Sequence, residues 1–378
     1  MRHRPPKVTV LVIGIGTVGG TLIEQILAGR ERWKSQLDLD IAVGSVAGPS
    51  GATAPDAELT DSTLHALVSG RRAGSPIAMA ARDAGLDLHP TERVINALAD
   101  AGPLVVIDAA AGDQTADADA LALHRGAGVV LSNKAPMALP SDHPAGRALW
   151  SEAGIGGRLK YEATCGAGLP VFSTLRSLLD TGDEVREIQG AVSGTLGAIF
   201  ADLATGTTFS AAVRSAMENG FTEPDPRDDL SGLDVARKAL ILARTLGVST
   251  DLADIRVEGL VPQNLSSSSG VDVRGFLERM DELDQDLATR VRDASRESRS
   301  LRYVATVTPA GPPRVGIDAV PVASALGGLR GPENAFSIRT ARYDTFPLSI
   351  SGPGAGSAVT AAGMLADVLS LATGTLAS

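Results

Sequence analysis

Short apolar runs alternate with longer amphipathic segments through the first part of the chain. The runs at 8–13, 39–46, 104–109 and 129–132 have the length and composition of buried strands, and the segments between them have helical periodicity. Residues 49–76 are rich in Gly, Ala, Pro and Ser and predict loop with a short helix. Because strands that alternate with helices usually pair in parallel, the pattern predicts an α/β fold with a parallel sheet.

The pattern changes after about residue 160. Residues 184–194 and 300–307 have the composition of strands, whereas 171–180, 211–219 and 231–246 have helical periodicity. These elements do not alternate regularly, so they predict a second domain of mixed α and β structure. A chain of 378 residues is long enough for two such domains.

Composition and charge narrow the class of protein. Hydrophobic residues make up 44% of the chain and charged residues 21%, as in globular proteins. A formal net charge of -10 and few aromatic residues argue against a nucleic-acid partner, and no apolar run reaches the roughly 20 residues of a membrane helix. Cys165 is the only cysteine, which excludes a disulfide within the chain and favours a reduced, cytoplasmic location.

A glycine turn follows the first predicted strand. Gly14, Gly16 and Gly19 form a G-x-G-x-x-G motif that opens a helix at about Thr17. In this motif the first glycine permits a tight turn, the second lets a pyrophosphate approach the backbone, and the third lets helix and strand pack closely. The turn predicts a dinucleotide site, with an ordinary glycine-rich turn as the alternative. The end of the next strand, GSVAGPSG, has neither an acid for a ribose nor an arginine for a 2′-phosphate, and the missing basic residue favours NAD over NADP.

Five carboxylates crowd the segment TEPDPRDDLSGLDVARKALILAR at 222–244, which continues as a helix that carries Lys238. The five are Glu223, Asp225, Asp228, Asp229 and Asp234. Because like charges at this spacing repel, they predict a site for a positively charged group. Asp234 and Lys238 share one helix face, either as a surface ion pair or as a lysine, oriented by an acid, that exchanges a proton with a substrate alcohol. Prolines after Glu223 and Asp225 stiffen these acids, which suits a substrate with an ammonium group.

Two further segments carry candidate chemistry. SNKAP places Lys134 after the fourth strand, at the carboxyl end of the predicted sheet where ligands of open α/β folds bind; a solvated loop lysine is the alternative. YEATCGAGLP, at 161–170, sets Glu162 before small residues whose carbonyl oxygens can bind a hard cation. A glycine-rich crossover between domains explains the same segment equally well.

The motifs follow one another along the chain as GIGTVGG, SNKAP, YEATCGAGLP, SGTLGAIF, GFTEPDPRDDLSGLDVARK and GPGAGSAVTAAG. In this order they resemble the homoserine dehydrogenase family over nearly the whole chain, and their spacing is most similar to the dehydrogenase half of fused aspartokinase-homoserine dehydrogenases. The resemblance implies an NAD(P)-dependent oxidoreductase that reversibly interconverts L-homoserine and L-aspartate 4-semialdehyde in threonine, methionine and isoleucine biosynthesis. No kinase segment precedes the motifs, so we expect the dehydrogenase half to stand alone.

The resemblance also implies roles for individual residues. Lys238 corresponds to the proton donor and acceptor, Lys134 to a lysine near the reacting carbon and the cofactor, and Asp234 to a substrate-binding acid beside Lys238. The other implied substrate-binding residues are Glu223, Asp229, Thr195 and Thr222. The implied cofactor-binding residues are Gly14, Gly16, Thr17, Val18, Gly19, Ala110, Lys134, Gly220 and Gly356. A site for a monovalent cation, sodium or potassium, at the domain junction is implied for Glu162 with the carbonyl oxygens of Cys165, Ala167 and Leu169.

The fold that the resemblance implies is a Rossmann-type parallel sheet domain completed by the C-terminal segment, with a central α+β domain for catalysis and dimerisation. We expect the nucleotide-binding domain at 1–160, the substrate-binding, catalytic and dimerisation domain at 161–340, and the returning segment at 341–378. The expected partners are a small amino-acid substrate and a second copy of the chain in a homodimer.

Three positions depart from the family pattern. Phe221 stands where the family usually has tyrosine, Gly197 where asparagine or serine is common, and 109–111 are alanines in place of a polar loop that often contacts the cofactor. The lost tyrosine hydroxyl removes a hydrogen bond worth about 0.5 to 1.5 kcal/mol. Two alternatives stay open: a paralogue that acts on a related amino-acid semialdehyde in a secondary pathway, and a catalytically idle cofactor-binding sensor, although both lysines and Asp234 are present.

Overall fold

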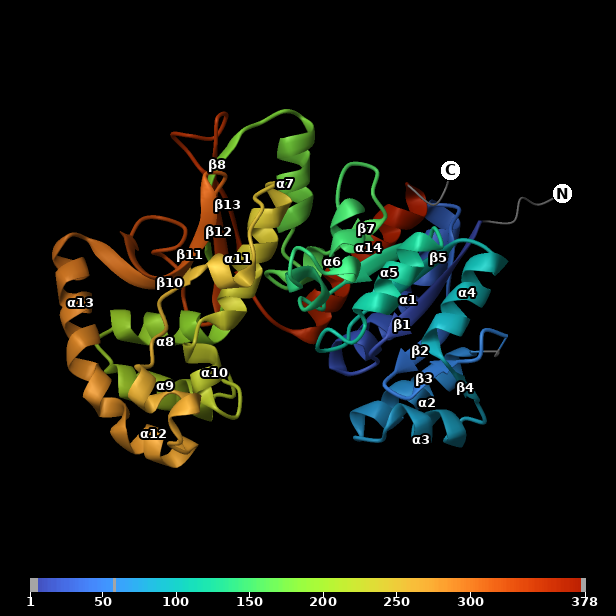
Figure 1. The fold of residues 1–378 in the computed structure, drawn as a ribbon, viewed down its shortest axis with the longest axis horizontal. Helices are drawn as coiled ribbons and strands as arrows, with labels where there is room; N and C mark the ends of the chain where they lie inside the picture. Colours follow the sequence, from blue (N-terminus) through green and yellow to red (C-terminus); the bar gives the residue numbers. More distant parts are fainter. Residues whose placement is uncertain (1–5, 57–58, 375–378) are drawn as a thin grey trace. The chain divides into compact units, whose positions relative to one another are not determined.

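The computed structural model describes residues 6–56 and 59–374 (Figure 1). Their contacts divide the chain into two compact units, each built around its own sheet. The first unit comprises the chain up to Phe172 and again from Gly356, and the second comprises Ser173–Ala355. Within the described ranges no helix is long and apolar enough to cross a membrane.

The first unit contains a seven-stranded sheet with the order β4-β3-β2-β1-β5-β6-β7. Its strands are β1 (Lys7–Ile13), β2 (Asp40–Gly48), β3 (Gly51–Thr53), β4 (Leu88–His89), β5 (Leu104–Asp108), β6 (Gly128–Leu131) and β7 (Leu159–Lys160). Its helices are α1 (Thr17–Gln36), α2 (Asp61–Arg72), α3 (Ile77–Asp83), α4 (Thr91–Ala101), α5 (Ala116–His124), α6 (Pro144–Ser151) and α14 (Ser357–Thr373). β1, β2, β5, β6 and β7 pair in parallel, and β3 and β4 extend one edge in antiparallel pairing.

The predicted parallel sheet is confirmed, and its strands are apolar because both faces are covered. The central residues 10–12 of β1 and all of β5 are buried. A sheet covered on both faces needs apolar side chains at successive positions, which the short runs provide. α1 packs beside α14, and α4 packs beside α5. Because crossovers between parallel strands are right-handed, the two pairs of helices lie on opposite faces of the sheet.

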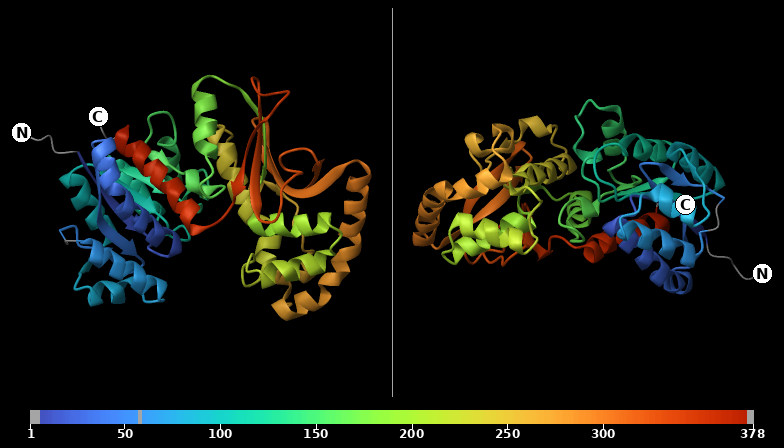
Figure 2. Two further views of the ribbon diagram at one scale, coloured as in Figure 1. Left: turned by 180° about the vertical axis from the view of Figure 1, so that it is seen from behind. Right: turned by 90° about the horizontal axis from the view of Figure 1, so that it is seen from below.

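Helix α14 brings the end of the chain back to the first unit. Figure 2 shows it alongside α1, where Gln25 Nε2 donates a hydrogen bond to Ala358 O at 2.9 Å. Its buried residues, Met364 among them, join the core of the parallel sheet. Gly363 packs closely on the loop after β7, since a Cβ there would lie 2.9 Å from Gly168 Cα. The C-terminal segment therefore completes this unit, as the resemblance implied.

The second unit contains a six-stranded sheet with the order β13-β12-β8-β10-β11-β9. Its strands are β8 (Val185–Ala191), β9 (Arg256–Val257), β10 (Arg299–Thr308), β11 (Gly311–Pro321), β12 (Glu333–Thr340) and β13 (Leu348–Pro353). Its helices are α7 (Val171–Asp180), which begins at the boundary, α8 (Gly194–Ala204), α9 (Phe209–Glu218), α10 (Pro226–Leu230), α11 (Leu233–Thr245), α12 (Val273–Arg279) and α13 (Asp284–Arg296). β9 pairs with β11 in parallel and the other pairs are antiparallel, which confirms the expected mixed domain.

The central strand β10 fixes where α11 begins. α8, α11 and α13 all pack against this strand. Tyr303, buried in β10, donates from its hydroxyl to Glu258 O at 2.7 Å. Gly232, the residue before α11, has a φ of +76°, and a Cβ there would lie only 1.9 Å from the Tyr303 hydroxyl oxygen. Glycine is required here by both its backbone conformation and the close approach, and it sets the start of the helix that carries Asp234 and Lys238.

Residues 49–76 contain more regular structure than expected. They include the short strand β3 and the twelve-residue helix α2. The side chain of Thr60 accepts a hydrogen bond from Thr63 N at 3.2 Å and caps α2. The buried residues Leu64, Leu67 and Val68 join the core of the first unit, and this packing stabilises a helix whose composition alone suggests a loop.

Candidate active site

The glycine turn joins β1 to α1 in the predicted manner. Gly14 has a φ of +84°, and a Cβ there would lie 2.7 Å from Ala110 N, so the turn packs directly on the loop after β5. A Cβ on Gly19 would lie 2.1 Å from Gly14 O, whereas nothing lies within 4 Å of the same position on Gly16. α1 begins after Gly16 with no side-chain cap and no acidic residue in its first turn. The backbone N–H groups at the start of α1 have no side-chain cap, and the space beside Gly16 is open, which together fit a pyrophosphate.

The other residues expected to bind the cofactor in the first unit begin helices or follow strands. Thr17 and Val18 form the start of α1. Ala110 follows β5 and Lys134 follows β6, and because these strands are parallel to β1 their carboxyl ends share one edge of the sheet. Gly356 is the N-cap of α14, with a φ of +125° that favours glycine.

A buried carboxylate that the sequence analysis did not single out organises this edge. Asp108 ends β5, and its Oδ1 accepts a hydrogen bond from Ala110 N at 2.8 Å. Its Oδ2 accepts from Thr115 Oγ1 at 2.6 Å and from Asn133 Nδ2 at 2.9 Å. Burial raises the pKa of Asp108 above its usual range, against the opposing effect of these hydrogen bonds. An acid at the end of the apolar run LVVID is the signal that could have found it.

Glu162, the expected cation ligand, lies buried in the turn after β7. Its Oε1 accepts a hydrogen bond from Phe172 N at 2.7 Å, and its own backbone N donates to Asp367 Oδ2 at 2.9 Å. Burial, followed by the charge of Glu162, raises the pKa of Asp367 to about 7. The sequence analysis missed Asp367, although it is the only acid in the apolar helix α14.

The other expected cation ligands lie in the same short loop. Cys165 and Ala167 are buried, and Leu169 N donates to Gly166 O at 3.0 Å. Ala167 has a φ of +56°, a left-handed conformation that is uncommon for a residue with a Cβ. In the described ranges no group of three or more His, Cys, Asp or Glu side chains could hold a metal ion, and the expected site instead combines one carboxylate with three carbonyl oxygens.

Lys238 is the centre of the site in the second unit. Its side chain is only 12% exposed, its Nζ donates to Val192 O at 2.6 Å, and it lies 2.7 Å from Asp234 Oδ2 one helical turn earlier. The Asp234 side chain is 47% exposed. Because the lysine is largely shielded from water, this ion pair differs from the exposed surface pair that was the alternative interpretation. Val192 contributes a backbone carbonyl, for which the sequence carries no signal.

Three residues from separate segments form an acid cluster in the same unit. The Thr195 hydroxyl, at the start of α8, donates to Asp229 Oδ1 at 3.0 Å and to Phe221 O. Glu223 N donates to Asp229 Oδ2 at 2.8 Å. Burial raises the pKa of Asp229, the hydrogen bonds from Glu223 and Thr195 lower it, and the charges of Asp234 and Asp228 raise it further. The predicted substrate residues Thr195, Glu223 and Asp229 are therefore neighbours, and Thr222 lies between Phe221 and Glu223.

Asp225, one of the five crowded acids, pairs with an arginine of the same segment. Asp225 caps α10 by accepting from Arg227 N at 3.0 Å and holds the buried Arg227 guanidinium through bonds of 2.7 to 3.0 Å. The guanidinium also donates to Val271 O at 2.7 Å and lies over the ring of Phe276, 5.5 Å from its centroid. The sequence analysis missed Arg227, which fastens the acidic segment to the residues before α12.

The structure shows the surroundings of the three positions that depart from the family pattern. Phe221, 41% exposed, lies beside Gly220, which has a φ of +69°. A Cβ on Gly197 would lie 3.0 Å from Gly331 O, so a larger residue there requires that neighbour to shift. The alanine turn at 109–111 contacts Gly14 through its backbone.

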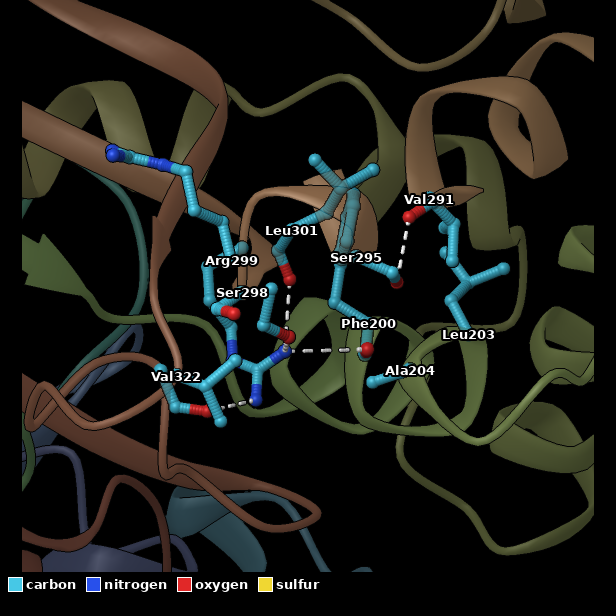
Figure 3. A pocket seen from close by; sticks show the side chains of 12 residues that line it. Phe200, Leu203, Ala204, Val291, Ser295, Ser298, Arg299, Leu301 and Val322 are labelled. Carbon is cyan, nitrogen blue, oxygen red and sulfur yellow. Dashed lines mark hydrogen bonds between the residues drawn. The ribbon is translucent and has the colours of Figure 1, made fainter. Parts of the chain in front are cut away.

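A surface cavity of the second unit, shown in Figure 3, is lined by other residues. It measures about 260 Å³ and lies among the ends of α8 and α13 and the start of β10. Arg302, buried at its edge, donates to carbonyl oxygens and to a serine hydroxyl: Phe200, Leu301, Leu326, Gly327, Leu329 and Ser300. Because oxygen atoms of the chain accept the hydrogen bonds of the Arg302 guanidinium, the cavity gives no indication of a ligand.

Comparison with known proteins identifies the family. The sequence profile of the family Homoserine dehydrogenase matches residues 170–369, more than half of the chain. The chain is 36% identical to the homoserine dehydrogenase of Saccharomyces cerevisiae, over 97% of this chain and 98% of that protein. It is 34% identical to the chloroplastic bifunctional aspartokinase/homoserine dehydrogenase 2 of Arabidopsis thaliana, over 96% of this chain but only 38% of that protein. The chain thus spans about two fifths of the length of this bifunctional relative.

Solved structures agree with this fold. A Candida auris protein of unknown function is 33% identical and superposes with a TM-score of 0.79 over 97% of this chain and 98% of that one. A hyperthermophilic archaeal homoserine dehydrogenase in complex with NADPH, 22% identical, superposes with a TM-score of 0.71 over 97% of each chain and supports the fold alone. These comparisons confirm the α/β fold and the expected family. The chain belongs to the homoserine dehydrogenase family.

Proposed function

We propose that this chain catalyses the reversible, nicotinamide-dependent interconversion of L-homoserine and L-aspartate 4-semialdehyde. The observation that carries the proposal is the partly buried Lys238, held by Asp234 and Val192 O in the same unit as the cluster of Thr195, Asp229 and Glu223. The near full-length similarity to the yeast homoserine dehydrogenase supports the same reaction.

Lys238 exchanges the proton of the substrate alcohol. In the oxidation direction its neutral amine accepts the hydroxyl proton as the carbon loses a hydride, and in the reduction direction its ammonium returns the proton to the carbonyl oxygen. Asp234 and Val192 O orient the nitrogen: Asp234 Oδ2 forms an ion pair with it at 2.7 Å, and Val192 O accepts its hydrogen bond at 2.6 Å. Lysine suits this role because partial burial changes its proton affinity readily.

The acid cluster receives the ammonium group of the amino-acid substrate. Burial and, to a smaller extent, the charges of Asp234 and Asp228 raise the pKa of Asp229, so its negative charge is disfavoured by burial and by its acidic neighbours. A positive group bound there favours the charged form. Thr195 and the backbone of Glu223 hold both oxygens of Asp229 in place and keep the cluster ready for that group.

The first unit holds the nicotinamide cofactor. The space above Gly16 and the uncapped start of α1 fit its pyrophosphate. When bound, the nicotinamide accepts or donates the hydride. The turn between β2 and β3, residues 48–51, has no lysine or arginine for a 2′-phosphate, which favours NAD. The archaeal relative binds NADPH, so NADP is the necessary comparison.

A monovalent cation near Glu162 is part of this proposal. Glu162 and Asp367 are both buried, the backbone N–H of Glu162 donates to the Asp367 carboxylate, and Ala167 in the same loop as Glu162 has a left-handed backbone conformation. Carboxylate and carbonyl oxygens are the ligands of hard cations. Dialysis against a bulky organic cation, followed by titration with sodium or potassium, should restore lost activity in the parent chain but not in Glu162→Gln. Full activity without either cation would contradict this part.

Two expectations about the setting of the protein belong to the same proposal. We propose a homodimer formed through the sheet of the second unit, and light scattering of the purified protein measures it directly. We also propose a cytoplasmic location, because a chain with a single cysteine forms no internal disulfide, as is usual in a reducing compartment.

The decisive experiment is the initial rate of NADH and NADPH oxidation with L-aspartate 4-semialdehyde, followed by the reverse reaction with L-homoserine. Rapid turnover in both directions supports the assignment and ranks the cofactors. Folded protein that binds a cofactor but does not turn over refutes it. Rates with related amino-acid semialdehydes then separate a paralogue, which turns over one of them, from an idle cofactor-binding protein, which turns over none.

A further inference from the structure

One buried side chain connects three segments at the carboxyl edge of the parallel sheet. Asp108, 0% exposed, binds Ala110 N through Oδ1 and both Thr115 Oγ1 and Asn133 Nδ2 through Oδ2. The backbone of the turn that holds Ala110 packs on Gly14, where a Cβ would lie 2.7 Å from Ala110 N. A single carboxylate thus connects β5 both to the glycine turn after β1 and to the loop after β6.

Asn133 extends this connection to both sides of Lys134. Its Nδ2 donates to Asp108 and to Gly112 O at 2.6 Å, and its Oδ1 accepts from Ala135 N at 3.1 Å. The residues before and after Lys134 are therefore held by one amide side chain. Because Asp108 holds that amide and also Ala110 N, the carboxylate connects the loop of Lys134 to the alanine turn.

A second buried acid lies behind the first. Asp119 on α5 is 0% exposed, and its carboxyl group interacts with that of Asp108. Burial, followed by the charge of Asp108, raises the pKa of Asp119 well above its usual range. Two neighbouring buried carboxyl groups share one charge. The three hydrogen bonds from Ala110, Thr115 and Asn133 favour the charged form of Asp108, whereas the raised pKa of Asp119 favours its neutral form.

We propose that Asp108 is a positioning residue that sets the alanine turn and the loop of Lys134 in one arrangement for the bound cofactor and the reaction. This inference rests on the proposed function. It follows from a feature of this chain: residues 109–111 are all alanine, so the turn can contact a cofactor only through its backbone and methyl groups. Without polar side chains on the turn, the place of the Ala110 backbone depends on the carboxylate that binds its N–H group.

The first test compares Asp108→Asn with the parent chain. An amide at this position can still accept from Ala110 N, but its own N–H groups oppose the donors of Thr115 and Asn133. We expect the Kd for the reduced cofactor, followed by its fluorescence, to rise about tenfold, and kcat at saturating substrates to fall about tenfold or more, as misplaced catalytic groups do. The matched control is Asp117→Asn, an exposed acid on α5, which should match the parent. A lower melting temperature with unchanged Kd and kcat would show a purely structural role and overturn the proposal.

The second test asks whether Asp108 acts through Lys134. In a Lys134→Ala background, Asp108→Asn should lower kcat by less than about twofold, because residues that act as a unit are not additive. The rise in cofactor Kd should persist in that background, since it comes from the alanine turn. An undiminished loss of kcat in the double variant overturns the connection to Lys134.

Two milder variants, both at Thr115, test the same connection if Asp108→Asn does not fold. Thr115→Val removes one donor to Asp108, and Thr115→Ser restores it. We expect the valine variant to raise the cofactor Kd severalfold and the serine variant to return it to the parent value; equal values for the two variants would count against the proposal. Cofactor Kd is measured without turnover, so these outcomes remain decisive if the parent chain fails to oxidise homoserine, a result that would sink the proposed function alone.

Discussion

Lys238 Nζ lies 2.7 Å from Asp234 Oδ2, one turn earlier on α11, and the lysine side chain is only 12% exposed while the acid is 47% exposed. The pair therefore has one buried member and one accessible member. A purely structural surface pair would leave both side chains in water. Here Val192 O and Asp234 both hold the lysine nitrogen, an arrangement that fits the proposed role in proton exchange.

Lys238→Ala should lower kcat about 100-fold to 10,000-fold, the range typical for loss of a positioned acid-base group. Cofactor Kd should stay within about twofold, because Lys238 belongs to the second unit and the glycine turn to the first. Stopped-flow turnover and fluorescence titration measure the two quantities. The control is Arg237→Ala, the exposed neighbour on the same helix. Near-parental turnover in Lys238→Ala would remove the lysine from the mechanism.

Phe221→Tyr restores a hydroxyl that the family usually has. The Phe221 carbonyl already accepts the Thr195 hydroxyl, so the backbone is held and only the ring gains a polar group. We expect kcat/KM for homoserine to rise by a factor of about two to ten, equivalent to the net value of one hydrogen bond. Steady-state kinetics with homoserine and with a related amino-acid alcohol distinguish the outcomes. A gain for the other alcohol and a loss for homoserine would favour a paralogue with a different substrate.

Asp225→Asn tests the ion pair that fastens the acidic segment. The Arg227 guanidinium beside it lowers the pKa of Asp225 below its usual range, so the pair stabilises the folded state above the unfolded pKa, about 4, and this contribution is lost as pH falls through the folded pKa. Asparagine keeps the helix cap but not the charge. We expect a loss of about 1.5 to 3 kcal/mol at pH 7, measured by urea unfolding. The difference should shrink below about pH 4.

The exposed Asp228 provides the control for this variant. Asp228→Asn removes a charge from the same helix without touching Arg227, so its effect should stay below about 1 kcal/mol. Equal losses in the two variants would mean that the net charge of the segment, and not the contact with Arg227, determines its stability.

The amino-acid sequence predicts the parallel strands β1, β2, β5 and β6 well, for a physical reason, but in the second sheet it predicts only β8 and β10. Strands covered on both faces need continuous apolar runs, and β5, with the sequence LVVID, is such a run with every residue buried. α2 was harder to predict because its composition suggests a loop and its stability comes from burial of Leu64 and Leu67. Packing of this kind depends on the finished fold and is not visible in a local window.

The sequence predicts which residues form the candidate site, but it does not predict which of them bind one another. The acids of 222–234 were found as a group, yet Asp225 binds Arg227 two residues away whereas Asp229 binds Thr195 thirty-four residues away. Local spacing cannot distinguish these outcomes, since they depend on where α8 meets α10. A backbone partner such as Val192 O cannot be predicted from residue type, because every residue has a carbonyl oxygen.

The buried pair behind the alanine turn gives the last prediction. Burial and the charge of Asp108 raise the pKa of Asp119, so Asp119 contributes most to stability below its unfolded pKa, about 4, and the contribution is lost as pH rises towards the folded pKa. This loss amounts to at most about 1.4 kcal/mol for each pH unit. Asp119→Asn removes the titrating group. Its stability relative to the parent should therefore increase steadily from pH 5 to pH 8, as measured by melting temperature at each pH. Asp117→Asn, exposed on the same helix, should show no such trend, and a pH-independent difference for Asp119→Asn would place the shared proton elsewhere.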